Sequence, residues 1–263
     1  MRRIVSELSR FYATPEGAVT RRMVAQKLAE AWPDVTGSDV LGLGYTTPYL
    51  DAFNGTARRV IAAMPSAQGA EIWPEGLKSR STLVDEQHMP FPSALFDRIF
   101  LMHALEESPN PEALLVEASR CLTTNGRLIL AVVARGGLWT HAEKTPFGHG
   151  QPFSRTQLET LLRVAELEPI AWSYALYVPP LRSLLRWAQT FEEWAPRVWP
   201  YRGGLILMEA GKRVIRAPVR GTAVSVIDDI RDKLGVPLPQ PANPAAGRDV
   251  SSLLRSNGQE ISS

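Results

Sequence analysis

Four histidines are the side chains of this chain that could exchange a proton near neutral pH, since the unperturbed imidazole pKa is about 6.5. His103 ends the apolar run LMHAL (101–105), whereas His141 and His149 lie in the segment ARGGLWTHAEKTPFGHGQPF (134–153). His88 precedes the turn-like MPFP and is expected at the surface. A histidine beside a reacting hydroxyl or amine can act as a general base, although one that only makes a structural hydrogen bond has the same local sequence. His103 and His149 are therefore candidate catalytic residues.

Other kinds of site are poorly supported. The chain has a single cysteine, Cys121, which excludes an intrachain disulfide and a multi-cysteine zinc site. His141 and His149 are eight residues apart with Glu143 between them, a spacing that fits no common metal motif. No Gly-x-Ser-x-Gly elbow is present, which disfavours a serine hydrolase. We predict no metal site.

The segment DVLGLGYTTPYL (39–50) begins with an apolar run that ends in Gly42-x-Gly44. A turn that binds a dinucleotide keeps a further glycine so that the helix can pack closely on the strand. Pro48 stands at that position, so the turn does not predict a dinucleotide site.

Seven apolar segments alternate with amphipathic ones and indicate strands: Asp39–Leu43, Arg59–Ala63, Thr82–Val84, Asp97–Leu101, Arg127–Ala134, Ile170–Val178 and Leu205–Ala210. Helices are expected over 111–122, with Pro111 in the first turn, and after Ser154, which forms a capping box with Gln157. This alternation predicts an α/β fold with a doubly wound, mostly parallel seven-stranded sheet. Ligands of such sheets bind beyond the carboxyl ends of the strands, where the strand order reverses.

Three zones are expected along the 263 residues. Residues 1–36 form an N-terminal helical cap, residues 37–215 form the α/β domain, and residues 216–263 form a flexible tail. The tail prediction depends on VPLPQPANPAAG (236–247), whose four prolines exclude regular structure. Short helical turns that form on binding a partner remain an alternative for parts of the tail.

Composition limits the partners and the location. The chain has 29 Lys and Arg against 27 Asp and Glu, and this balance disfavours nucleic acid as a partner. Its mean hydropathy is −0.11, and its longest apolar run, LILAVVA (128–134), is far shorter than the ~20 residues that cross a bilayer. The start, MRRIVSELSR, lacks the apolar stretch of a secretory signal. We expect a cytoplasmic protein without a transmembrane segment.

Several features in fixed order run from Asp85 to Gly126. They are Asp85 itself, the MPFP stretch (89–92), Phe96-Asp97 before a strand, Leu105-Glu106, a helix that starts with proline, Arg120 with Leu122, and Gly126 before the next strand. In this order the chain resembles the class I S-adenosylmethionine-dependent methyltransferases of the type 11 group. The resemblance implies a Rossmann-like methyltransferase fold, with S-adenosylmethionine as the cofactor.

The resemblance also implies roles for individual residues. The cofactor would be lined by the first turn and by the loops after the third and fourth strands, that is by Gly42, Gly44, Tyr45, Asp85, Glu86 and Met102, with Asp85 and Glu86 at its adenine end. His103 or His149 would assist the methyl acceptor.

Two positions depart from the family pattern. The acid that ends the first strand is replaced by Gly42, and the later glycines of the turn are replaced by Thr46 and Pro48. The acid that holds the ribose in the family would fall near Met64, but no carboxylate precedes Glu71. Losing that contact costs about 3–5 kcal/mol of binding unless Glu71, Glu75 or Asp85 replaces it.

A tryptophan-rich segment follows the predicted sixth strand. A helix is expected over Leu181–Ala195, and Trp187, Trp194 and Trp199 widen its apolar surface between arginines. One interpretation is that the helix packs on the sheet. The alternatives are a lid, a dimer surface or a peripheral contact with a membrane. Glu192 and Glu193 weaken the membrane alternative.

Two functional hypotheses follow. The first is a methyltransferase with a divergent cofactor loop, whose small or apolar acceptor is held under the 135–153 loop and the 181–195 helix. The second is a non-catalytic protein of the same fold that binds a protein partner or senses a ligand. The oligomeric state is not predicted.

Overall fold

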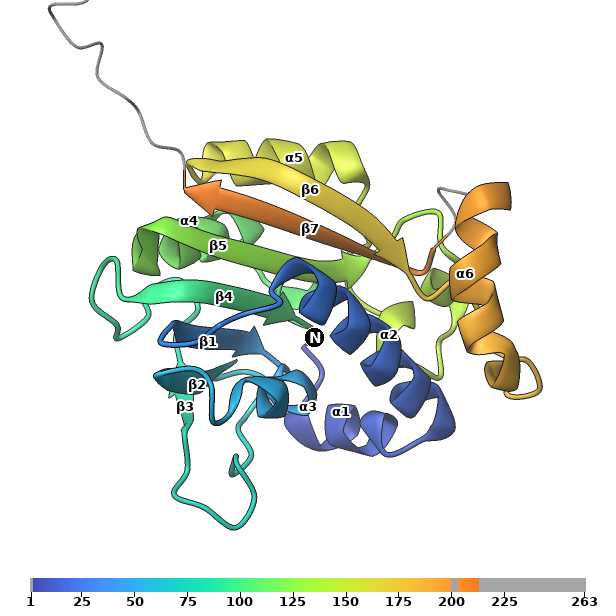
Figure 1. Ribbon diagram of the computed structural model, residues 1–263, viewed down its shortest axis with the longest axis horizontal. Coiled ribbons are helices and arrows are strands. Elements are labelled where there is room, and N and C mark those ends of the chain that lie inside the picture. The colour runs from blue at the N-terminus through green and yellow to red at the C-terminus, as the bar shows by residue number, and fades with distance from the viewer. Residues whose placement is uncertain (1, 200–202, 213–263) are drawn as a thin grey trace, which may run out of the picture. The chain divides into compact units, whose positions relative to one another are not determined.

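The structure is a computed structural model, and it describes residues 2–199 and 203–212. Its centre is one seven-stranded sheet in the order β3-β2-β1-β4-β5-β7-β6 (Figure 1). The strands are β1 (Asp39–Gly44), β2 (Arg59–Pro65), β3 (Ser81–Val84), β4 (Phe96–Met102), β5 (Leu122–Val133), β6 (Leu167–Ala175) and β7 (Leu205–Lys212). Among these strands β7 pairs antiparallel with β5 and β6, and the other neighbouring pairs are parallel. The predicted doubly wound fold is confirmed.

Helices cover both faces of the sheet, which explains why its central strands are apolar on both sides. Val40 and Met64 face the side that carries α2 (Pro15–Ala31) and α3 (Thr47–Leu50). Leu41 and Leu43 face the opposite side, which carries α4 (Pro111–Cys121) and α5 (Arg155–Val164). The predicted proline start of α4 and the capping box of α5 are both present.

The N-terminal zone, predicted to be helical, consists of α1 (Val5–Tyr12) and α2. Thr14 ends the turn between them and accepts a hydrogen bond from the Gly17 N–H, and Pro15 occupies the first helical position. The Cβ of any other residue at position 17 would lie 2.1 Å from the Phe11 carbonyl oxygen. This tight turn lets α1 lie beside the carboxyl ends of the strands (Figure 1).

Two predicted elements have clearly different bounds in the structure. The sixth strand ends at Ala175 rather than Val178, because Leu176 adopts a left-handed backbone (φ 60°) that interrupts the ladder. The predicted helix 181–195 is instead the 3-10 turn η5 (Leu185–Trp187) followed by α6 (Ala188–Val198). The buried side chains of Leu185, Ala188 and Ala195 fix the position of this segment on the body. Pro196 lies in the last turns of α6, where it removes only one backbone hydrogen-bond donor.

The predicted tail, 216–263, lies outside the described residues. No helix in the described ranges is both long enough and apolar enough to cross a membrane.

Candidate functional site

The strand order reverses between β1 and β4, so the crevice beyond their carboxyl ends is the expected ligand site. At this point Gly44 pairs with Met102, and the Tyr45 N–H donates to the Met102 carbonyl oxygen at 2.8 Å. The predicted residues Gly44, Tyr45, Met102 and His103 therefore come together, as the resemblance implies.

The two glycines of the turn are needed by the packing of the protein itself. Gly44 has a left-handed backbone (φ 89°), and a Cβ there would lie 2.3 Å from the Met102 carbonyl oxygen. A Cβ at Gly42 would lie 2.1 Å from Thr46 Oγ1. Pro48 falls within the first turn of the short α3, where its missing N–H has no helical partner to lose. The altered glycine pattern is thus compatible with a well-packed turn.

His103 lies at the centre of the crevice and is buried. Its backbone is left-handed (φ 52°), its ring stacks on Phe147 at 5.1 Å between centroids, and Nε2 shares a 2.9 Å hydrogen bond with the Tyr12 hydroxyl. Burial lowers the pKa of His103 to about 3. The imidazole is therefore neutral at neutral pH.

Tyr12 of α1 contacts His103 and joins it to two further tyrosines. The Tyr12 and Tyr49 hydroxyls are 2.9 Å apart, and the Tyr12 ring stacks on Tyr45 at 5.5 Å. Burial raises the pKa of Tyr45 to about 12 and raises those of Tyr12 and Tyr49 well above their usual value. All three hydroxyls are therefore protonated hydrogen-bonding groups.

The chain start spans the loops that follow β2, β3 and β4. We call residues 2–12 the N-terminal strap. The Arg2 side chain forms a buried ion pair with Glu86 and donates to the Ala104 carbonyl oxygen at 2.9 Å. The Val5 N–H donates to the Gln68 carbonyl oxygen at 2.8 Å, and the Arg3 N–H donates to Glu107 at 2.6 Å.

Sequence reasoning missed this strap. The only signals were a charged start and a tyrosine before the proline of α2, and neither points to a distant partner.

Polar atoms without a partner are buried beneath the strap. Gln68 donates its amide N–H to the His103 carbonyl oxygen at 3.1 Å. Two buried acceptors, Gln68 Oε1 and Glu106 Oε2, and one buried donor, Arg2 Nε, have no hydrogen-bond partner. Burial raises the pKa of Glu106 to about 7. Buried polar atoms are nearly always paired, so these atoms are candidates for contacts with a polar ligand.

Asp85 and Glu86, which were predicted to lie together at the adenine end, point in different directions. Asp85 is exposed, accepts the Gln87 N–H at 2.9 Å and faces His88; these contacts lower its pKa. Glu86 is buried and also accepts the Ser108 hydroxyl at 2.6 Å. Only Glu86 faces the crevice.

Glu71, one of the acids considered as a replacement for the missing ribose ligand, does reach the first turn. It accepts the Thr47 hydroxyl at 2.5 Å and the Tyr45 hydroxyl at 3.4 Å. A carboxylate that the sequence places after β2 is thus held against the β1–α3 turn.

The long loop after β5 forms one wall of a separate hollow of about 950 Å³. Phe147 and Trp139 anchor this loop, and the Trp139 N–H donates to the Val178 carbonyl oxygen at 2.8 Å. α1 and the segment 180–182 form the other walls. The hollow is lined by His141 and by side chains of both charges: Arg3, Glu7, Arg10, Glu16, Glu143, Lys144 and Arg182. His149 is exposed and its Nε2 bonds to the Glu143 backbone oxygen at 2.8 Å, so the loop does not bring it to His103.

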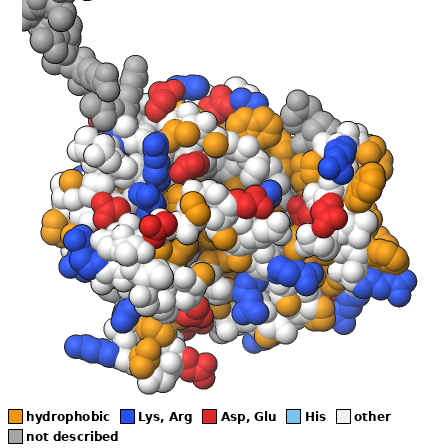
Figure 2. All heavy atoms as spheres, viewed as in Figure 1, with side chains coloured by type: hydrophobic (Ala, Val, Ile, Leu, Met, Phe, Trp, Pro, Cys, Tyr) orange, Lys and Arg blue, Asp and Glu red, His pale blue; other side chains and the backbone are white. Residues whose placement is uncertain are grey.

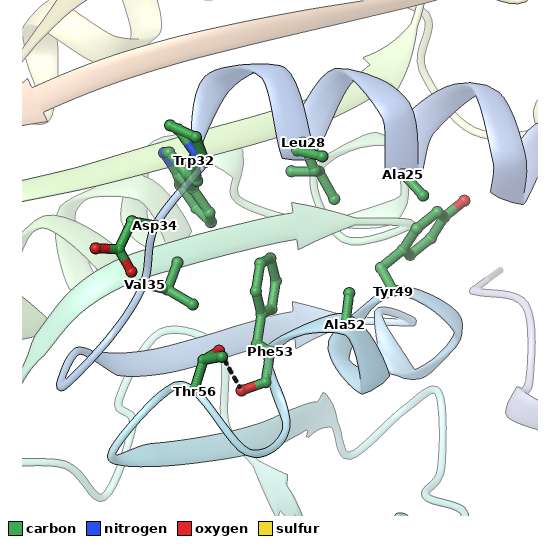
Figure 3. A pocket seen from close by; sticks show the side chains of 11 residues that line it. Ala25, Leu28, Trp32, Asp34, Val35, Tyr49, Ala52, Phe53 and Thr56 are labelled. Atoms are coloured by element: carbon green, nitrogen blue, oxygen red, sulfur yellow. Dashed lines mark hydrogen bonds between the residues drawn. The ribbon is translucent and has the colours of Figure 1, made fainter.

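A second hollow lies under α2, with a volume of about 210 Å³ (Figure 3). Figure 3 shows the Trp32 and Phe53 rings and the Leu28 side chain around it, and Asp34 is its only charged side chain. It offers no cluster of groups for a reaction. In the described part of the chain, no three His, Cys, Asp or Glu side chains could hold a metal ion together.

Comparison with solved structures supports the fold. A SAM-dependent methyltransferase from Thermotoga maritima, described as a possible histamine N-methyltransferase, is 18% identical with a TM-score of 0.57, over 79% of this chain and 96% of that one. One from Archaeoglobus fulgidus is 14% identical with a TM-score of 0.55, over 77% and 96%. The [4+2]-cyclase SpnF is 21% identical with a TM-score of 0.52, over 74% and 81%.

Sequence comparison gives the family. A search of curated proteins finds no match to the chain. A family model, the methyltransferase domain, matches residues 18–171, which include β1 to β5 and the crevice between β1 and β4. Over this match the chain belongs to the class I S-adenosylmethionine-dependent methyltransferase family.

Proposed function

We propose that this chain is an S-adenosylmethionine-dependent methyltransferase whose cofactor binds beyond the ends of β1, β2 and β4 once the N-terminal strap has moved away. One observation carries the proposal: the unpaired polar atoms of Gln68 and Glu106, buried where the strand order reverses. A ligand that pairs with these atoms would be stabilised by them, because each buried unpaired polar group costs about 1–3 kcal/mol.

The residues present fit a nucleoside that carries an amino acid. Gln68 Oε1 and the Glu71 carboxylate are the acceptors near the end of β2 that would hold the ribose hydroxyls. Glu86, released from Arg2, would accept from the adenine end. The cofactor supplies an electrophilic methyl group on a positively charged sulfur.

The strap has to move first. Arg2 bridges Glu86 and Ala104, and Gln68 bonds to the His103 carbonyl oxygen. In this proposal the adenosine would lie between the loops after β3 and β4 that Arg2 joins, and the Gln68 contact would also have to open.

Methyl transfer depends mainly on alignment and on exclusion of water, and the crevice supplies both through its buried aromatic wall. His103 is neutral and would orient an acceptor by a hydrogen bond. Glu106, whose pKa is about 7, would accept a proton near neutral pH, whereas His149 bonds to the backbone of its own loop, away from His103. The acceptor itself would reach the crevice from the charged hollow under the 135–153 loop.

The test is calorimetric titration of the full chain with S-adenosylmethionine and S-adenosylhomocysteine. Arg2→Ala leaves Glu86 buried without its partner, which disfavours the closed strap by about 3–5 kcal/mol. Because the apparent affinity scales with the population of the open state, we expect Arg2→Ala to bind at least about tenfold more tightly than the unsubstituted chain. Arg10→Ala, which removes an exposed arginine of the same strap, should bind like the unsubstituted chain.

Two outcomes would contradict the proposal. Weaker binding by Arg2→Ala means that Arg2 contacts the cofactor and that the strap stays closed over the bound cofactor. The absence of binding by every variant up to about 1 mM, a free energy weaker than about −4 kcal/mol, removes the cofactor from this site.

That last outcome would favour the second candidate, a protein of this fold without methyl transfer. The specific observation behind it is the end of β2, where the buried Met64 and Pro65 stand in place of an acid. The same fold is found in a protein described as a [4+2]-cyclase, so the fold alone does not fix the reaction.

A further inference from the structure

The segment around α6 carries the largest gathering of exposed tryptophan in the described residues. Trp187, Trp194 and Trp199 have half or more of their surface exposed, at 50%, 61% and 60%. Leu181 and Val198 are exposed to 56% and 65%. Single exposed apolar residues are ordinary, but a contiguous group of this size marks a surface that binds something.

These side chains share one direction. Trp187, Trp194 and Val198 are separated by seven and four residues, so they lie along one stripe of the helix. The buried Ala188 and Ala195 each follow a tryptophan by one residue, about 100° around the helix, and they fix α6 to the body. Figure 2 shows hydrophobic side chains gathered at the right edge of the molecule, over α6, with basic side chains among them.

Two arginines accompany the tryptophans. The Arg186 guanidinium carbon lies 5.6 Å from the centroid of the Trp187 ring, and that of Arg197 lies 5.3 Å from the Trp194 ring. Within the described residues neither arginine forms an ion pair with a carboxylate. Their positive charges are therefore available beside the rings.

The two glutamates of this segment do not neutralise the surface. Glu192 turns toward the body, where its carboxylate accepts the Tyr177 N–H at 3.0 Å and burial raises its pKa. Glu193 accepts the side-chain N–H of Gln189, one turn earlier, at 3.0 Å. Arg186, Arg197 and Glu193 are thus the exposed charged side chains of α6 and its preceding turn, whereas Glu192 faces the body.

We propose that this surface binds an anionic lipid bilayer. Tryptophan prefers the boundary between headgroups and acyl chains, because its ring is apolar and its N–H is polar. An arginine beside it can extend its stem along the apolar layer and bond to a lipid phosphate. Tryptophan and arginine are also common at protein interfaces, so the experiment below includes self-association as an outcome that would overturn the proposal.

The experiment is co-sedimentation of the full chain with vesicles of phosphatidylcholine alone and of phosphatidylcholine with about one third phosphatidylglycerol, an anionic lipid. We expect binding to the anionic vesicles and much weaker binding to the neutral ones. Trp187→Ala/Trp194→Ala should weaken binding by at least about tenfold, given the apolar area withdrawn from the bilayer. Arg186→Gln/Arg197→Gln should weaken binding to anionic vesicles by about fivefold for each charge.

A matched control uses exposed apolar residues on another part of the molecule. Ile72→Ala/Leu77→Ala alters side chains that are 78% and 66% exposed in the connection between β2 and β3, and it should leave vesicle binding unchanged. Unfolding by urea verifies that all three double variants keep their stability. Equal loss in the control and in the tryptophan variant overturns the proposal.

Other results would also overturn it. Equal binding to neutral and anionic vesicles removes the role of the arginines. No binding at millimolar lipid, together with a dimer in sedimentation velocity that Trp187→Ala/Trp194→Ala dissociates, assigns the surface to self-association. Because none of these readouts uses cofactor or methyl transfer, the result is independent of the proposed function.

Discussion

Gly44 and Gly37 have similar left-handed backbones, with φ of 89° and 69°, but different surroundings. A Cβ at Gly37 meets nothing within 4 Å, whereas at Gly44 it meets the Met102 carbonyl oxygen. The conformational cost of alanine should therefore be common to both positions, and only Gly44 adds a clash with backbone of the neighbouring strand.

We expect Gly37→Ala to lower the free energy of unfolding by about 1 kcal/mol and Gly44→Ala to lower it by about 2–4 kcal/mol. Urea unfolding of both variants measures the difference. Similar losses would show that β1 and β4 separate easily at this point. A substitution at Gly44 thus lowers the stability of the fold, and its effect on ligand binding has to be measured separately from that loss.

Glu106 couples the stability of the protein to pH. Its pKa is about 7 in the folded protein, above its ordinary value of 4.5, so the folded state holds a proton that the unfolded state releases. This contribution to stability is complete below about pH 4.5 and is lost as the pH rises through about 7. His103, with a lowered pKa of about 3, acts in the opposite direction: its contribution is present above about pH 6.5 and is lost as the pH falls toward 3.

Glu106→Gln keeps an acceptor for the Val133 N–H and removes the titration. We expect the difference in unfolding free energy between this variant and the unsubstituted chain to grow by up to about 3 kcal/mol between pH 5 and pH 8, in favour of the variant. Comparing the two chains cancels the contribution of His103. A difference that does not change with pH would place the Glu106 carboxyl in contact with water.

At the scale of elements, the strap is held by a few strong contacts rather than by a large apolar area. Of its residues only Leu8 and Phe11 are buried apolar side chains. The polar contacts that attach it include Arg2, the Arg3 and Val5 N–H groups and the Tyr12 hydroxyl. Segments with few buried apolar contacts open at low cost relative to the core. The strap therefore has the properties of an element that opens while the sheet stays folded.

Arg2→Ala should speed hydrogen exchange of the amides of α1, including Val5, by about tenfold or more without changing exchange in β1 and β4, because an unpaired buried Glu86 disfavours closure. Arg10→Ala serves as the control in the same helix. Faster exchange in the strands as well would mean that the strap and the sheet unfold as one unit.

At the scale of the molecule, the order of the strands brings the groups of the site together. β1 and β4 are neighbours although β2 and β3 lie between them in sequence. The loops after β2, β3 and β4 therefore converge with the first turn on one side of the reversal, and the strap reaches all three of these loops.

The sequence alone determined the seven strands, the helix that begins with Pro111 and the one capped by Ser154, since these follow from local periodicity and capping; the rules of parallel sheets added the expected place of a ligand site. Tertiary structure decided which polar groups share the crevice. Arg2 and Glu86 are 84 residues apart, and Asp85 and Glu86 are adjacent yet point to water and to the interior. The physical reason is that a side chain's partners depend on how distant segments pack, and packing leaves no periodic mark on the sequence.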